Sequence, residues 1–223
     1  MREGDVIRLI EAAGSLPALP NVATRVIEAT DGPGTTVKEV AGLIEKDMAL
    51  SAKVLQIINS PFYGFSRGIS SVNEAVSLMG FKQVGSLALG LAAMSSLPKV
   101  DVVGFDYEAF WECSLANAVA AVMITSHVNR EASHGIFTVS LLQNIGTYLL
   151  ARYLPVLHGY ALAMAEERDL HHAKAESEAL GTNHAEIGTH LASRWNLPPN
   201  MTVPIRHHHD LDVSSFFRCM YLY

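Results

Sequence analysis

Apolar residues recur along the chain at spacings of three and four residues, which is the period of an α-helix rather than of a strand. The segment from Val37 to Ile44 follows this pattern, and Thr36 with Glu39 forms a capping box at its start. A second helix is predicted to begin after Asp47, another residue type that caps helices. No window shows the sustained alternation of a strand bounded by hairpin turns. The pattern therefore predicts an all-α fold.

The same period continues through the rest of the chain. Ser71 with Glu74 forms another capping box, and Gly80 is well placed to end that helix. Residues 81–97 are apolar on most sides, which predicts a buried helix. The longest apolar stripe follows Asp106, and we expect that helix to run through the middle of a bundle. Further helical pieces are expected at residues 136–142, 148–153, 161–168, 184–195 and 198–210.

Pro, Lys, Asp and Gly gather between Leu97 and Phe105, which predicts a boundary there. We expect an N-terminal helical lobe of residues 1–100 and a helical bundle of residues 101–223. Trp111 and Trp195 each lie on an apolar stripe and are expected to be buried. The apolar, aromatic tail of residues 213–223 shows no helical face; we expect it to be poorly packed, covering a groove or forming a dimer contact.

Composition narrows the class of protein. The chain has 223 residues, a net charge of −6, 49% hydrophobic and 17% charged residues, as is typical of a compact globular protein. No Lys/Arg run is present, so we expect no nucleic-acid partner. Two cysteines make no disulfide scaffold and favour a reducing compartment. Two uncharged runs, one between Lys82 and Lys99 and one between Glu112 and Arg130, are diluted by polar residues, so we expect core helices and a cytoplasmic protein rather than membrane insertion.

Ten histidines raise the question of a metal site. Arg206 to Asp210 carries three consecutive histidines, of which at most two can point to one metal if they lie on a helix. His184 lies on the core-facing side of its helix, where a hydrogen-bonded histidine is the alternative to a ligand. No HExxH, Cys/His finger or glycine-rich phosphate loop occurs, so spacing alone identifies no enzyme. Five other histidines are expected to be solvated: His127, His134, His158, His171 and His172.

An ordered series of motifs resembles the HDOD domain, the HD-related output domain of bacterial signalling proteins. The resemblance runs from Leu16 to Asp210. Its carriers are Leu16-Pro17-Ala18-Leu19-Pro20, Asp47 to Leu55 with Ile58-Asn59-Ser60, Ile69 to Gly80, Phe110-Trp111 with Ser114, Leu141-Leu142 with Ile145-Gly146, and His184 to Gly188 with Trp195 to Pro198. The resemblance implies an HD-domain-like helical bundle related to metal-dependent HD and HD-GYP phosphohydrolases.

The resemblance also implies a degenerate metal site. Cys113 stands where such an enzyme has a histidine, and Gln143-Asn144 stand where it has the His-Asp pair. His184 and either His207 or His208 correspond to later ligands. Neutral amides are poor ligands for the metals of such sites, and the lost aspartate removes charge that would retain the cation. We therefore expect no catalytic residue and no cofactor, with adventitious divalent metal at His184, His207 or His208 as the alternative.

These observations predict a non-catalytic regulatory module that acts through contacts with other signalling proteins. The pathway context, near cyclic dinucleotides, comes from the resemblance alone. Two alternatives remain open. One is a metal-dependent phosphohydrolase or phosphodiesterase with an unusual ligand set; the other is a small-ligand sensor that uses the vacated pocket around Gln143, Asn144 and His184. A homodimer is a further alternative for the assembly.

Overall fold

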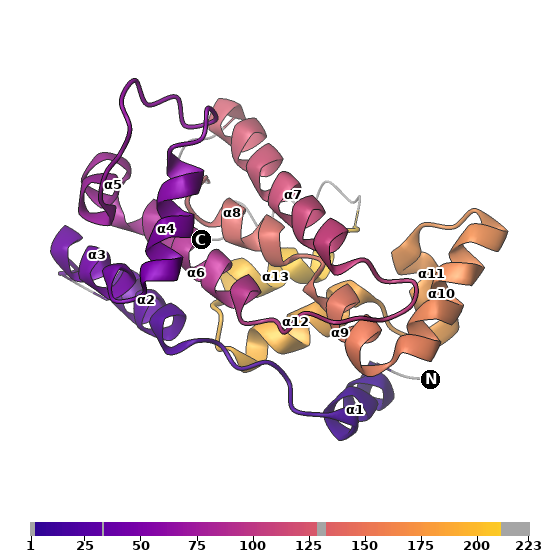
Figure 1. Cartoon of the computed structure of the whole chain (residues 1–223). Coiled ribbons are helices and arrows are strands. Elements are labelled where there is room, and N and C mark those ends of the chain that lie inside the picture. Colours follow the sequence, from indigo (N-terminus) through magenta and orange to yellow (C-terminus); the bar gives the residue numbers. More distant parts are fainter. Residues whose placement is uncertain (1–2, 33, 129–132, 211–223) are drawn as a thin grey trace. The chain divides into compact units, whose positions relative to one another are not determined.

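The computed structural model describes residues 3–32, 34–128 and 133–210, and these form helices joined by connecting segments (Figure 1). The described residues contain no β-sheet; one isolated bridge joins Val102 and Phe105. The predicted all-α fold is confirmed. The helices are α1 (Glu3–Ala13), α2 (Asn21–Asp31), α3 (Val37–Glu45), α4 (Met48–Ile58), α5 (Val72–Met79), α6 (Phe81–Ser95), α7 (Tyr107–Val128), α8 (Ser133–Leu142), α9 (Ile145–Tyr153), α10 (Pro155–Arg168), α11 (His172–Leu180), α12 (His184–Arg194) and α13 (Pro199–His207).

Side-chain caps set where several helices begin. The hydroxyl of Thr36 accepts from the backbone N–H of Glu39, and the Asp47 carboxylate accepts from that of Leu50, at 3.2 and 3.0 Å. Asn183 accepts from two N–H groups in the first turn of α12. Each oxygen satisfies a donor that the first turn of a helix leaves unpaired, so these predicted starts are confirmed.

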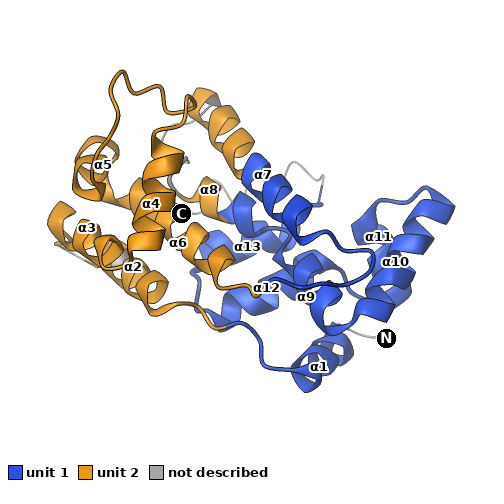
Figure 2. Ribbon diagram, viewed as in Figure 1, with its two compact units in different colours: residues 1–17, 99–117, 139–223 blue, residues 18–98, 118–138 orange. Residues whose placement is uncertain are grey.

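The chain divides into two compact units, coloured separately in Figure 2. One comprises residues 1–17, 99–117 and 139–223; the other comprises residues 18–98 and 118–138. The division near residue 98 lies where the sequence predicted a boundary, but the two units are not the continuous segments 1–100 and 101–223. Residues 1–17 belong with the later helices because α1 packs against α9 and α12.

In the unit of residues 18–98 and 118–138, α6 is the central helix. Its residues from Val84 to Met94 are all buried, which confirms the prediction of a core helix. α2 packs closely on it: a Cβ atom on Gly85 would lie 2.6 Å from the Cγ2 atom of Thr30. The buried hydroxyls of Ser86 and Thr138 hydrogen-bond at 2.7 Å, which satisfies polar atoms inside this core.

In the other unit, α9 and α12 pack at the centre, and α10, α11 and α13 surround them. Tyr148, Leu149 and Leu150 of α9 are fully buried. Gly146 allows the two central helices to approach, because a Cβ atom there would collide with the carbonyl oxygen of His184 and would lie 2.8 Å from the backbone nitrogen of Gly188. The position of α12 therefore depends on a glycine at the start of α9.

The long helix α7 differs from its predicted role as the buried centre of a bundle. It is long and apolar enough to cross a membrane by length and composition, and only 17% of that stretch is buried. The buried positions Ser114, Ala118 and Val122 form one narrow ridge, whereas Met123 and Ile124 are 49% and 67% exposed. Apolar residues occur all around this helix, so packing one ridge leaves the others uncovered.

Two other expectations need correction. Trp195 is buried as predicted, but Trp111 is only half-buried, although it lies on the same face of α7 as Ser114, Ala118 and Val122. Helices α1, α2 and α11 were not among the predicted segments. The expectation for the tail, residues 213–223, falls outside the described residues.

Candidate functional site: a histidine cluster

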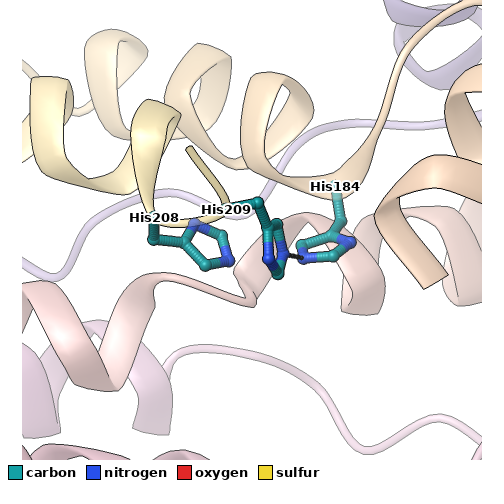
Figure 3. A group of neighbouring side chains, drawn as sticks. All are labelled: His184, His208 and His209. Carbon is teal, nitrogen blue, oxygen red and sulfur yellow. Dashed lines mark hydrogen bonds between the residues drawn. The ribbon is translucent and has the colours of Figure 1, made fainter. Parts of the chain in front are cut away.

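Three histidine side chains converge at the ends of two helices (Figure 3). His184 is the first residue of α12, His208 follows the last residue of α13, and His209 comes next. One ring nitrogen or more from each lies within 4.8 Å of the others. Asn183 fixes the start of α12 and hence the position of His184, while the fully buried Ile205 anchors the end of α13. Local helix boundaries thus bring together residues 25 positions apart in the chain.

A buried carboxylate holds His184 in one orientation. Oε2 of Glu176, on α11, lies 2.7 Å from both the backbone nitrogen and the ring Nδ1 of His184. A carboxylate oxygen can only accept hydrogen bonds, so Oε2 accepts from both the backbone N–H and Nδ1 of His184. In the neutral side chain, the ring proton must therefore be on Nδ1. The Nε2 atom of His184 is then left with a lone pair directed at the cluster.

His208 is fixed in the same tautomer by the backbone. Its Nδ1 lies 2.8 Å from the carbonyl oxygen of Ile205, which can only accept, so Nδ1 carries the proton. Its Nε2 atom is buried and has no hydrogen-bond partner among the described residues. A buried nitrogen with an unused lone pair is costly unless something binds it. Two of the three histidines therefore present a lone pair on Nε2.

His209 lies between the other two rings in Figure 3. Its Nε2 is 2.7 Å from Nε2 of His184, and its ring centroid is 3.9 Å from that of His208. Burial, followed by the nearby His208, His184 and His171, lowers the pKa of His209 to about 3. Burial also lowers the pKa of His208, partly opposed by its hydrogen bond to the Ile205 carbonyl. Both side chains are therefore neutral near pH 7, the form that binds metals.

The structure separates the site positions named from the sequence. His184 and His208 lie in the cluster, whereas the Nδ1 atom of His207 turns to Asp210 at 2.6 Å. Gln143 and Asn144 are half-buried in the turn between α8 and α9. Cys113 is exposed on α7. Among the His, Cys, Asp and Glu side chains of the described residues, the group of possible ligands does not include Cys113.

Sequence reasoning missed His209 and Glu176. α13 ends at His207, so His208 and His209 leave the helix and need not point about a hundred degrees apart. The sequence did offer one signal for Glu176, because this acidic residue lies on the same face of α11 as the apolar residues Ala173 and Leu180, which are buried. His158 was expected to be solvated, and this is wrong: it is 3% exposed, and its Nδ1 has no partner among the described residues.

A separate hollow of about 450 Å³ lies in the unit that contains α2 and α3. Three cationic and two carboxylate side chains line it, with apolar atoms between them: Arg25, Glu28, Lys38, Glu39 and Lys46. Charges of both signs at an open surface resemble an ordinary solvated rim. The histidine cluster is the stronger candidate because buried lone pairs converge there.

Comparison with known proteins supports the family resemblance. The HDOD domain model matches residues 16–211. An HDOD domain protein of unknown function from Geobacter sulfurreducens has a similar structure, with a TM-score of 0.79 and 25% identity, covering 94% of this chain and 72% of that one. A candidate phosphohydrolase from Shewanella amazonensis has a TM-score of 0.72 and 27% identity, covering 91% and 71% of the two chains.

The curated relative is considerably longer than this chain. An uncharacterized protein of Treponema pallidum (strain Nichols) is 25% identical over 197 residues, which are 88% of this chain and 38% of that protein. A candidate signal transduction protein from Marinobacter aquaeolei has a TM-score of 0.70 and 26% identity, and the match covers this whole chain but 49% of that one. The chain therefore spans well under half of the curated relative and about half of this solved protein.

Proposed function

This chain belongs to the HDOD domain family, and we propose that it is a non-catalytic regulatory module that acts through contacts with other proteins. The observation that carries this proposal is the composition of the histidine cluster, defined by His184, His208 and His209. Possible ligands converge there as three imidazoles, with no carboxylate among the described residues of the group. Two nearby carboxylates already have hydrogen-bond partners, Glu176 with Nδ1 of His184 and Asp210 with Nδ1 of His207.

The burial of the cluster opposes phosphoester hydrolysis. A catalytic metal site keeps one coordination position open to water and substrate, whereas a structural site is closed. The Nε2 atom of His208 is fully buried, and His184 is 4% exposed. A phosphoester also brings negative charge, which hydrolases neutralise with further cations or metal ions held by carboxylates. Gln143 and Asn144 supply neutral amides where the family resemblance expects a His-Asp pair.

Exposed apolar side chains on α7 offer a surface for protein contact. Met123 and Ile124 are adjacent and about half or more exposed, on a helix whose packed ridge is narrow. We take this pair as the candidate contact surface because it lies on the long helix whose apolar residues are covered along one ridge only. We name this pair the α7 contact residues.

Hydrolysis assays test the catalytic half of the proposal. The purified chain should not hydrolyse bis(p-nitrophenyl) phosphate or cyclic dinucleotides with Mn²⁺, Fe²⁺, Mg²⁺ or Zn²⁺ supplied. Turnover that depends on metal and disappears in His184→Ala or Asn144→Ala would favour a metal-dependent phosphohydrolase. That alternative would require the three imidazoles to hold an ion that is open to water, as the three histidines of a catalytic zinc site do.

Site-specific cross-linking tests the contact half. A photoreactive residue at position 124, expressed in the native cell, should give a discrete adduct with another protein. The same residue at Lys38, a polar surface position on α3, serves as the control and should not give that adduct. An adduct only with a second copy, or only with lipid, would contradict the proposal and indicate a homodimer or a membrane contact.

A further inference from the structure

The tautomers of the histidine cluster are those that metal-binding histidines adopt. A metal-ligating histidine almost always donates its other ring N–H to a carboxylate or a backbone carbonyl, which fixes the ring and raises its basicity. His184 donates from Nδ1 to buried Glu176, and His208 donates from Nδ1 to the Ile205 carbonyl. Both present Nε2 to the same place. A hydrogen bond from His209 accounts for the lone pair on Nε2 of His184. The lone pair on Nε2 of His208 is not accounted for, because this atom has no partner among the described residues.

We propose that His184, His208 and His209 bind one divalent transition metal ion of the borderline class, Zn²⁺ above all, through their Nε2 atoms. Imidazole nitrogens suit Zn²⁺, Cu²⁺ and Ni²⁺ better than Mg²⁺ or Ca²⁺, which prefer oxygen ligands. Three protein ligands leave one position for water in a tetrahedral site. The inference does not depend on the proposed regulatory function, because an ion can bind at a site too buried to admit a phosphoester.

The geometry requires the side chains to adjust. With Zn–N bonds of about 2.0–2.1 Å, tetrahedral ligands lie about 3.3 Å apart. One ring nitrogen of each histidine lies within 4.8 Å of the others, so the widest separation must close, whereas the 2.7 Å separation between the Nε2 atoms of His184 and His209 must widen. That contact requires a proton on Nε2 of His209, since the Nε2 of His184 carries none. Metal binding shifts this proton to Nδ1 of His209 and leaves the number of bound protons unchanged.

The proposed ion links two elements. His184 begins α12, and His208 with His209 ends the segment that contains α13. A bound ion therefore ties the end of α13 to the start of α12, adding to the ion pair between Arg206 and Glu186 at 3.4 Å. Binding that occurs only in the folded state raises the free energy of unfolding with the logarithm of the free metal concentration. Occupancy should therefore protect this unit against unfolding.

The experiment uses the whole chain without a histidine tag, stripped by a chelator and titrated with Zn²⁺ against a chromophoric competitor. We expect one equivalent to bind, and Co²⁺ at the same site to show the visible absorption of a tetrahedral complex. His209→Ala removes a ligand and should weaken Zn²⁺ binding by more than about tenfold, the loss that removing only a ligand's hydrogen-bond partner already causes. His207→Ala is the matched control, since the neighbouring side chain turns to Asp210, and its affinity should stay within about twofold of wild type.

Several outcomes would overturn the inference. One is that the wild type binds no stoichiometric Zn²⁺, and another is that His209→Ala binds Zn²⁺ as tightly as the wild type. A third is that His207→Ala loses as much Zn²⁺ affinity as His209→Ala, which would indicate an adventitious ion only, held by surface histidines. Because His184→Ala removes a buried partner of Glu176 and can unfold the chain, His208→Asn serves as a second variant with circular dichroism as a check. A folded His208→Asn protein that binds Zn²⁺ as wild type does would also contradict it.

Discussion

Oε2 of Glu176 accepts two hydrogen bonds from His184, one from its backbone nitrogen and one from its ring Nδ1, each at 2.7 Å. The first bond satisfies an N–H in the opening turn of α12, and the second sets the ring tautomer. The carboxylate is 2% exposed and His184 is 4% exposed, so neither group can turn to water instead. One buried oxygen thus links the position of a helix to the chemistry of the histidine cluster.

Removal of this carboxylate should destabilise the protein substantially. Glu176→Ala leaves two buried donors of His184 unpaired, at about 1–3 kcal/mol for each unsatisfied group. Glu178→Ala, two residues along the same helix, removes an exposed ion pair with Arg168 and should cost less than about 1 kcal/mol. Urea unfolding of both variants measures the difference. Equal stabilities would mean that the Glu176 bonds add nothing that water does not replace.

Gly146→Ala should be among the more damaging small substitutions in the chain. The added Cβ meets the backbone of α12 at His184 and Gly188, and backbone cannot rotate away as a side chain can. Overpacking typically costs about 1–3 kcal/mol and more where no relaxation is available. Gly159→Ala is the control: nothing lies within 4 Å of its Cβ position in α10, so alanine should raise stability by about 1 kcal/mol. Thermal melts that rank the two variants in the opposite order would contradict this packing.

Trp195 and Trp111 should respond differently to truncation. Trp195 is 7% exposed and its indole N–H donates to the Pro17 carbonyl oxygen at 2.8 Å. Trp195→Ala should cost about 3–5 kcal/mol, the range for a large core residue. Trp111 is half-buried, so Trp111→Ala should cost roughly 1–2 kcal/mol. Denaturant midpoints with matched slopes test this, and a larger loss at Trp111 would show that α7 is more deeply packed in solution.

Local chemistry made much of the fold predictable from the sequence. Thr36, Asp47 and Ser71 were identified as caps because a cap needs only a short polar side chain and the next few backbone N–H groups. The helix α6 was predictable because its residues are apolar on most sides. The burial of α7 was not, because the sequence shows which residues are apolar but not how many partners surround them.

The histidine cluster depends on contacts that no short segment contains. His209 joins it only because α13 ends at His207, and helix ends are the least certain part of a sequence-based assignment. Glu176 meets His184 across a turn between two helices, one of which was not predicted at all. The resemblance supplied His184 and His208 as candidates, and tertiary packing supplied the third imidazole and the carboxylate behind the first.

His158 should make the protein sensitive to mild acid. Its side chain is 3% exposed, packs against the edge of Phe105, and leaves Nδ1 without a partner among the described residues. Burial lowers the pKa of His158, opposed by the charge of Glu176 and assisted by His172 and His184. The folded protein therefore resists a proton that the unfolded chain accepts near its ordinary pKa of about 6.5. Stability is fully present above that value and falls as pH decreases toward the folded pKa, by at most about 1.4 kcal/mol per pH unit for one proton.

His158→Leu and His158→Gln both remove the titrating group, the first with an apolar side chain and the second with a polar one. Both variants should show a weaker dependence of stability on pH than the wild type. Urea unfolding midpoints of the wild type and both variants, measured on either side of about pH 6.5, give the change in stability with pH for each protein. If both variants keep the wild-type slope, the acid sensitivity arises from other groups and the burial of His158 has no part in it.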